Sequence, residues 1–198
     1  MIAYWYHLDA LWPILVWAAV LAVTMVGVCA SVLALRFQRR WMVYLSSSAL
    51  GAALIIANIP TRPAPALVTA LLTIAVLAFA VLGGGPAAML VLALASRGSV
   101  AIGSHGGIVV ASAAADAPAT ARREVLRGGT TIGFLERFAT AGAIVAGFPA
   151  ALAVIVAVKG VGRFTELDAA ESRERFIIGT LVSLIWACAC AAIAHAVG

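Results

Sequence analysis

The apolar stretch Leu67–Ala95, LVTALLTIAVLAFAVLGGGPAAMLVLALA, decides the fold class of this chain. It contains no charged residue. As a helix it would be about 43 Å long at 1.5 Å per residue, whereas the hydrocarbon core of a bilayer is about 30 Å thick. A run of this length and polarity is typical of a helix in lipid.

The composition of the whole chain agrees with this interpretation. Of 198 residues, 64% are hydrophobic and 11% are charged, and the mean hydropathy is +1.10. These values exclude ordinary soluble, disordered and disulfide-framework proteins. Because backbone polar groups in lipid must bond within the chain, we expect an all-α, polytopic helical membrane protein.

Further apolar segments on both sides of the first stretch predict six transmembrane helices. The expected spans are residues 11–35, 41–59, 65–84, 129–147, 150–164 and 176–197. In the third span, Gly83-Gly84-Gly85-Pro86 is expected to end the helix, because proline lacks an N–H and clashes with the preceding turn. Residues 86–95 would then form a short interfacial or re-entrant segment, and length alone leaves both alternatives open.

The polar segments divide the chain into three parts and set its orientation. We expect an N-terminal three-span half with the interfacial segment in residues 1–97, a loop in 98–128 and a C-terminal three-span unit in 129–198. Nearly all of the 13 Lys and Arg residues fall in connections on one side. Since basic connections stay in the cytoplasm, the large loop is predicted to be cytoplasmic and both termini to lie outside the cell membrane.

The pair Glu136-Arg137 is the most unusual feature of the fourth span. An ionisable side chain inside a span costs roughly 2.5 to 3.5 kcal/mol on insertion scales, so each needs a partner or a function. If the fourth and fifth spans are antiparallel about Phe148, Glu136 lies at the depth of Lys159. The polar layer predicted near the cytoplasmic side consists of Glu136, Arg137, Lys159, Arg163, Thr180 and Ser183.

Three interpretations of this layer remain open. A salt bridge between Glu136 and Lys159 would only fasten a three-helix unit. The surplus positive charge would instead bind an anion or an acidic lipid headgroup, and a proton relay through Glu136 is the third. In the sixth span, Gly179, Ser183, Ala187 and Ala191 form a small-residue ridge that we expect to pack on the fourth and fifth spans.

No motif predicts a catalytic site, a cofactor or a metal. The three cysteines lie inside spans without CxxC spacing, and no nucleophile and base occur in a known pattern. This favours a non-enzymatic protein without deciding the point. The expected function is transport-related or accessory, with a structural or partner-binding subunit as the alternative. The expected partners are the bilayer, acidic lipid headgroups, and a second copy or a membrane partner protein, but no nucleic acid.

Three blocks of the C-terminal part carry a resemblance. They are Leu126–Arg137, Val158–Phe164 and Glu174–Thr180, with Gly83–Pro86 and His105–Gly107 similar as well. In their order and spacing they resemble a family of uncharacterised actinobacterial multi-pass membrane proteins. The resemblance covers the chain from about Gly83 onward. It implies a membrane location and no particular activity.

Overall fold

The computed structural model describes residues 2–95, 129–163 and 170–197, with side chains described for 11–95, 129–161 and 173–197. This part of the chain is helical apart from short connections, which confirms the all-α prediction for it. The predicted loop 98–128 and the side chain of Arg163 lie outside the described residues. The helices are α1 (Ile2–Phe37), α2 (Arg40–Ala57), α3 (Ala66–Ala95), α4 (Gly129–Val145), α5 (Ala151–Arg163) and α6 (Ala170–Val197).

Four of these helices are long and apolar enough to cross a bilayer: Leu11–Phe37 of α1, all of α2 and α3, and Arg173–Val197 of α6. The other two are shorter, since α4 has 17 residues and α5 has 13. At 1.5 Å per residue they are about 25 and 20 Å long, against a hydrocarbon core of about 30 Å. The structure therefore has the apolar helices of a membrane protein, and the count of six full spans stays a prediction.

The glycine and proline run of the third helix does not break it, and the expected interruption there is wrong. The α3 helix continues through Gly83-Gly84-Gly85 and has Pro86 inside it, so residues 86–95 continue the helix and are not a separate segment after a break. Proline within a helix leaves the carbonyl four residues earlier without its donor, but neighbouring helices in lipid can supply polar groups nearby. The carbonyl that Pro86 leaves without its donor is that of Leu82. The adjacent carbonyl, that of Val81, accepts a hydrogen bond from Arg137 of α4.

The other helix ends agree with the sequence more closely. The bounds of α2, α4 and α5 lie within two residues of the predicted spans 41–59, 129–147 and 150–164. Two helices begin earlier than expected, α1 at Ile2 and α6 at Ala170. Charged residues and prolines mark most of these ends, which is why the sequence predicts them.

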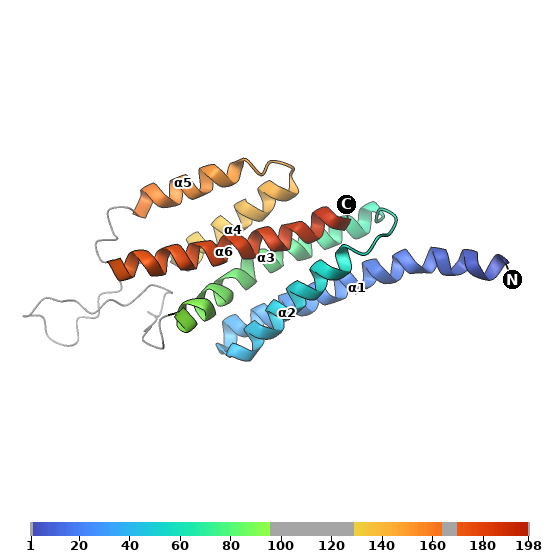
Figure 1. Ribbon diagram of the computed structural model, residues 1–198, viewed down its shortest axis with the longest axis horizontal. Helices are drawn as coiled ribbons and strands as arrows, with labels where there is room; N and C mark the ends of the chain where they lie inside the picture. The colour runs from blue at the N-terminus through green and yellow to red at the C-terminus, as the bar shows by residue number, and fades with distance from the viewer. Residues whose placement is uncertain (1, 96–128, 164–169, 198) are drawn as a thin grey trace, which may run out of the picture.

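The helices α3 and α6 form the centre of the bundle and lie side by side (Figure 1). The α1–α2 pair covers one side of them, and α4 packs against both from the other side. The outermost helix, α5, lies along α4. In the small-residue ridge of α6, Ser183, Ala187 and Ala191 are buried and Gly179 is half-buried. The ridge faces α3 and α4 rather than α5: a Cβ on Gly179 would contact Leu92 of α3, and Ser183 bonds to α4.

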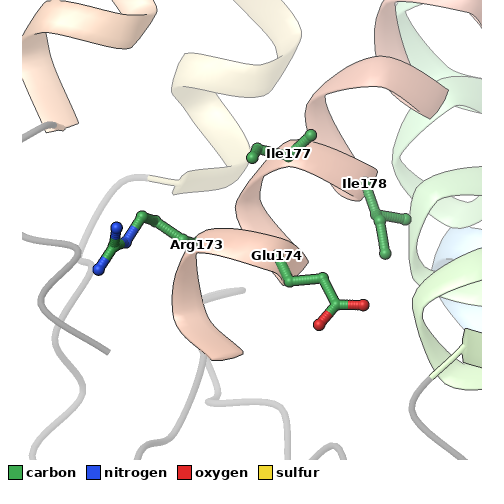
Figure 2. A pocket seen from close by; sticks show the side chains of 4 residues that line it. All are labelled: Arg173, Glu174, Ile177 and Ile178. Carbon is green, nitrogen blue, oxygen red and sulfur yellow. The ribbon is translucent and has the colours of Figure 1, made fainter. Parts of the chain in front are cut away.

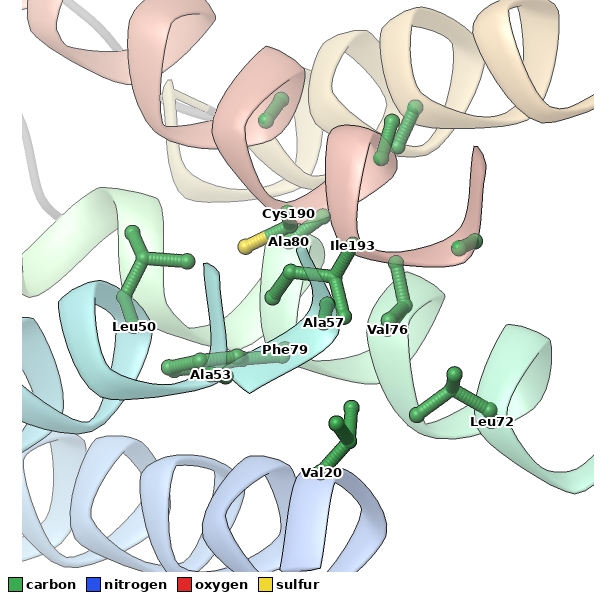
Figure 3. Close-up of a cluster of buried hydrophobic side chains, with 14 of the residues drawn as sticks. Val20, Leu50, Ala53, Ala57, Leu72, Val76, Phe79, Ala80, Cys190 and Ile193 are labelled. Atoms are coloured by element: carbon green, nitrogen blue, oxygen red, sulfur yellow. The ribbon is translucent and has the colours of Figure 1, made fainter. Parts of the chain in front are cut away.

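The apolar core joins α1, α2, α3 and α6 (Figure 3). Its fully buried members include Val20 from α1, Ala53 from α2, Phe79 from α3 and Ile193 from α6. In lipid, helices associate mainly through close packing and interhelical hydrogen bonds. Small residues in this core therefore determine how closely the helices approach.

Gly83 of α3 is in close contact with Trp186 of α6. A Cβ on Gly83 would lie 2.4 Å from the indole of Trp186. That indole packs edge-on against Phe79 with ring centroids 5.4 Å apart, and its Nε1–H donates to the Phe79 carbonyl at 3.2 Å. The Trp186 ring is fixed from two directions, so it has little freedom to move away from an added methyl group.

We expect Gly83→Ala to lower the free energy of unfolding by about 1–3 kcal/mol, the usual cost of overpacking a core. Gly51→Ala is the matched control, because a Cβ on Gly51 of α2 meets nothing within 4 Å. The control should leave stability unchanged or raise it slightly, since alanine favours the helix. Unfolding in mixed detergent micelles measures both variants. Equal stability of the two would contradict the close approach of α3 and α6.

Candidate functional site

Arg137 is the central polar residue of the bundle. It lies in the middle of α4, and only 4% of its surface is exposed. Its Nε–H donates to the carbonyl oxygen of Val81 at 2.8 Å, and Nη1 donates to Oγ of Ser183 at 3.0 Å. One side chain of α4 thus bonds to both α3 and α6.

Three glycines make room for this guanidinium. A Cβ on Gly84 would lie 2.4 Å from Cδ of Arg137, and a Cβ on Gly133 would lie 3.2 Å from Nη1. Gly85 lies slightly further away, with its hypothetical Cβ 3.5 Å from Nη2. The Phe134 ring lies below the guanidinium, with its centroid 5.3 Å from Cζ, a favourable cation–π arrangement. We call Gly84, Gly85, Gly133 and Phe134 the arginine socket.

The socket fits the guanidinium rather than a separate ligand. A buried cation is tolerated only when acceptors replace its water shell, and hydrogen bonds to charged groups contribute about 1.5–3 kcal/mol each. The α3 carbonyl and the α6 hydroxyl provide these acceptors. Larger residues at the glycine positions would occupy the space that Arg137 fills.

A second polar contact joins α4 to α5. The ammonium group of Lys159 forms an ion pair with Oε2 of Glu136, as the antiparallel arrangement about Phe148 predicts. The pair is mostly removed from solvent, because the side chains of Lys159 and Glu136 are 18% and 14% exposed. Nζ of Lys159 also lies 5.7 Å from the ring centroid of Phe176, at the start of the apolar part of α6.

The predicted polar layer therefore consists of two separate contacts. Arg137 and Ser183 meet on the side of α4 that faces α3 and α6, whereas Glu136 and Lys159 meet on the side that faces α5. Thr180 is half-buried one turn before Ser183 and makes no hydrogen bond within the described part of the chain. The binding of an anion or headgroup by these residues stays a prediction.

Sequence reasoning missed the contribution of α3. Gly83–Gly85 were interpreted only as a helix end, and the Val81 carbonyl was not considered. The position of Gly84 and Gly85 beside Arg137 is a signal for close packing, but it becomes visible only when α3 is known to continue. The structure also buries Oγ1 of Thr140 on α4 without a hydrogen-bond partner among the described residues.

The surface hollows lie away from Arg137. One of about 400 Å³ at the start of α6 is lined by Arg173, Glu174, Ile177 and Ile178 (Figure 2). Figure 2 shows the Arg173 and Glu174 side chains on different sides of the helix. An anion in this hollow would meet a carboxylate as well as a guanidinium, so its electrostatics do not favour one. Another hollow, of about 270 Å³, lies beside Arg62 at the opposite end.

We expect Ser183→Ala to lower the free energy of unfolding by about 1.5–3 kcal/mol, because Nη1 of Arg137 would lose a buried acceptor. Ser48→Ala is the matched control: Ser48 is exposed and bonds only to the Leu45 carbonyl in its own helix. Its effect should stay within about 0.5 kcal/mol. The same micelle unfolding assay applies. A Ser183→Ala variant as stable as the native chain would mean that Arg137 does not depend on α6.

Comparison with protein-family models, curated proteins and solved structures finds no match for this chain. The resemblance to actinobacterial membrane proteins therefore stays a prediction, and the function is argued from the residues of the site.

Proposed function

We propose that this protein is a non-catalytic, multi-pass protein of the cell membrane that serves as a structural or partner-binding subunit. The observation that carries the proposal is that the buried charges already have partners within the chain. Arg137 bonds to α3 and α6, and Lys159 is paired with Glu136. Side chains bonded in this way stabilise the arrangement of α3, α4, α5 and α6.

A second candidate function is binding of an acidic lipid headgroup at the same end of the bundle. Lys159 keeps 18% of its side chain exposed, and Arg173 is exposed on the neighbouring helix. Basic residues near the cytoplasmic leaflet attract acidic lipids by about 1 kcal/mol each. The ligand would then be a phosphate-bearing headgroup, and Arg163 and Thr180 would complete the site, without Ser183, which is buried and bonded to Arg137 in the other contact.

The two candidates predict different results for Glu136→Gln, Lys159→Met and the double variant. If the pair is a fastener, each single variant lowers stability and the double variant loses less than the sum, with a coupling energy of about 1–3 kcal/mol. Retention of phosphatidylglycerol during purification should then be the same in all four proteins. Micelle unfolding and lipid extraction provide the two measurements.

The lipid candidate predicts a different pattern in the same proteins. Lys159→Met should lose phosphatidylglycerol, whereas Glu136→Gln should retain as much or more, because the carboxylate that competes for Lys159 is gone. That pattern, together with the absence of any coupling energy, would contradict the structural function. Phosphatidylcholine retention controls for nonspecific loss of lipid.

We further propose that the basic end of the bundle faces the cytoplasm and that both termini lie outside. The α1–α2 connection with Arg36, Arg39 and Arg40, the end of α3 and the start of α6 all lie at one end of the bundle (Figure 1). The α2–α3 connection with Arg62 lies at the other end. This asymmetry supports the orientation. If α4 and α5 are two full spans, or if they enter and leave the membrane on the same side, the number of membrane crossings is even in both cases. The two termini therefore lie on the same side of the membrane either way.

Labelling of intact cells with a membrane-impermeant maleimide tests this orientation. Thr61→Cys in the α2–α3 connection should react, and Gln38→Cys in the α1–α2 connection should react only after the membrane is opened. The native chain, whose Cys29, Cys188 and Cys190 lie within helices, gives the background. The reverse pattern would place the basic end outside and overturn the proposal.

A further inference from the structure

We propose that α4 and α5 form a re-entrant hairpin, which enters the bilayer from the basic end of the bundle and turns within the hydrocarbon. The turn at Gly147–Pro149 and the outer surface of α5 would then contact lipid acyl chains instead of water. This arrangement would replace the two full spans predicted from the sequence. Four observations support it: the depth of the turn, its composition, its backbone bonding and the exposed surface of α5.

The depth of the turn follows from the Arg137 contact. Arg137 and Ser183 lie at the same level, because their side chains are hydrogen-bonded. From this level α6 continues to Val197 and rises by about 21 Å, whereas α4 rises only about 12 Å to its end at Val145. Figure 1 shows the same relation, since the α4–α5 turn stops short of the level reached by the end of α6 and by the α2–α3 connection.

The composition of the turn is that of a buried segment. No charged residue occurs between Phe138 and Val158, and Thr140 is the only residue in this range with a hydroxyl, amide or charged side chain. At the tip, Phe148 is 64% exposed. By contrast, the α2–α3 connection contains Asn58, Thr61 and Arg62, as a turn in water normally does.

Two backbone hydrogen bonds close the end of α4 within the turn. The N–H of Phe148 donates to the Ala143 carbonyl at 2.8 Å, and the N–H of Gly147 donates to the Ile144 carbonyl at 3.0 Å. Gly147 has a φ of 75°, so this is a Schellman motif with glycine in its usual left-handed position. Pro149, which follows Phe148, has no N–H to satisfy. A turn with so few free donors can lie in hydrocarbon, where each unsatisfied group costs several kcal/mol.

The surface of α5 indicates which molecules surround it. Among residues 151–161, the large exposed apolar side chains are Val154, Val156, Val158 and Val161. Val154, Val158 and Val161 lie along one side of the helix, and Val156 lies on the opposite side, so the exposed apolar surface is wider than a single stripe. Charged residues are absent from the tip half of the hairpin: on α4 they occur from Arg137 and Glu136 towards Arg127, and on α5 from Lys159 to Arg163. Lipid acyl chains around the uncharged tip and lipid headgroups at the charged open end fit this distribution of charge.

Cysteine labelling at the tip distinguishes the re-entrant hairpin from two full spans. We expect Phe148→Cys to be unreactive towards impermeant maleimide in intact cells and in inside-out vesicles, and to react once SDS dissolves the membrane. Thr61→Cys is the matched control for a turn in water. Labelling of Phe148→Cys from the same side as Thr61→Cys, to a similar extent, would overturn the proposal.

Fluorescence quenching identifies what covers α5. Bimane attached to Val158→Cys should be quenched several-fold more by phosphatidylcholine with brominated acyl chains than by a water-soluble quencher. Disulfide cross-linking between two copies at this position, without quenching by brominated lipid, would mean that a second copy covers α5 and would contradict the lipid contact.

Hydrogen exchange of the native chain in lipid nanodiscs avoids the effect of any substitution on folding. The amides of residues 146–153 should exchange as slowly as those in the middle of α3. Exchange as fast as in residues 58–64 would show that the turn is in water, and the re-entrant hairpin would then be wrong.

Discussion

The bundle depends on one requirement, namely that the buried guanidinium of Arg137 must be surrounded by acceptors. The Val81 carbonyl and the Ser183 hydroxyl meet it from two different helices. Successive residues on a helix point about 100° apart, so rotating α4 by one residue would turn Arg137 away from both acceptors. The arginine therefore fixes the rotation of α4 as well as its depth, and the arginine socket is complete only when α3, α4 and α6 are all in place.

The same requirement explains why α3 carries a glycine run and a proline in its interior. Glycines weaken a helix in water because they add backbone entropy to the unfolded chain. In lipid this cost matters less than close approach, since helices there associate through packing and hydrogen bonds rather than through the hydrophobic effect. Gly83 accommodates Trp186 and Gly84 accommodates Arg137. A sequence that looks like a helix break in water is thus a contact surface in a membrane.

Because a glycine run can be either a helix break or a packing surface, the sequence alone could predict only part of the structure. The Glu136–Lys159 pair was predictable, because Gly147 and Pro149 fix a tight turn and equal distances from it give equal depth. Most helix ends were predictable as well, because charges and prolines cannot enter the hydrocarbon cheaply. The partners of Arg137 were not: one is a backbone carbonyl 56 residues away in the sequence, and every residue has such a carbonyl. The short length of α5 could be interpreted only by comparison with the longer helices α3 and α6 in the structure.

Neighbouring residues Glu136 and Arg137 hold two different interfaces, and the difference bears on α5. The helices α3, α4 and α6 interlock through buried side chains, so α4 has several contacts that maintain its position. By contrast, α5 packs mainly along α4 and exposes its valines. Apolar contact with α4 gains little over contact with acyl chains, because lipid is as apolar as valine. The Schellman turn and the Glu136–Lys159 pair are therefore the interactions that keep α5 antiparallel to α4. The Phe176 ring beside Lys159 adds a contact with α6 at the open end of the hairpin.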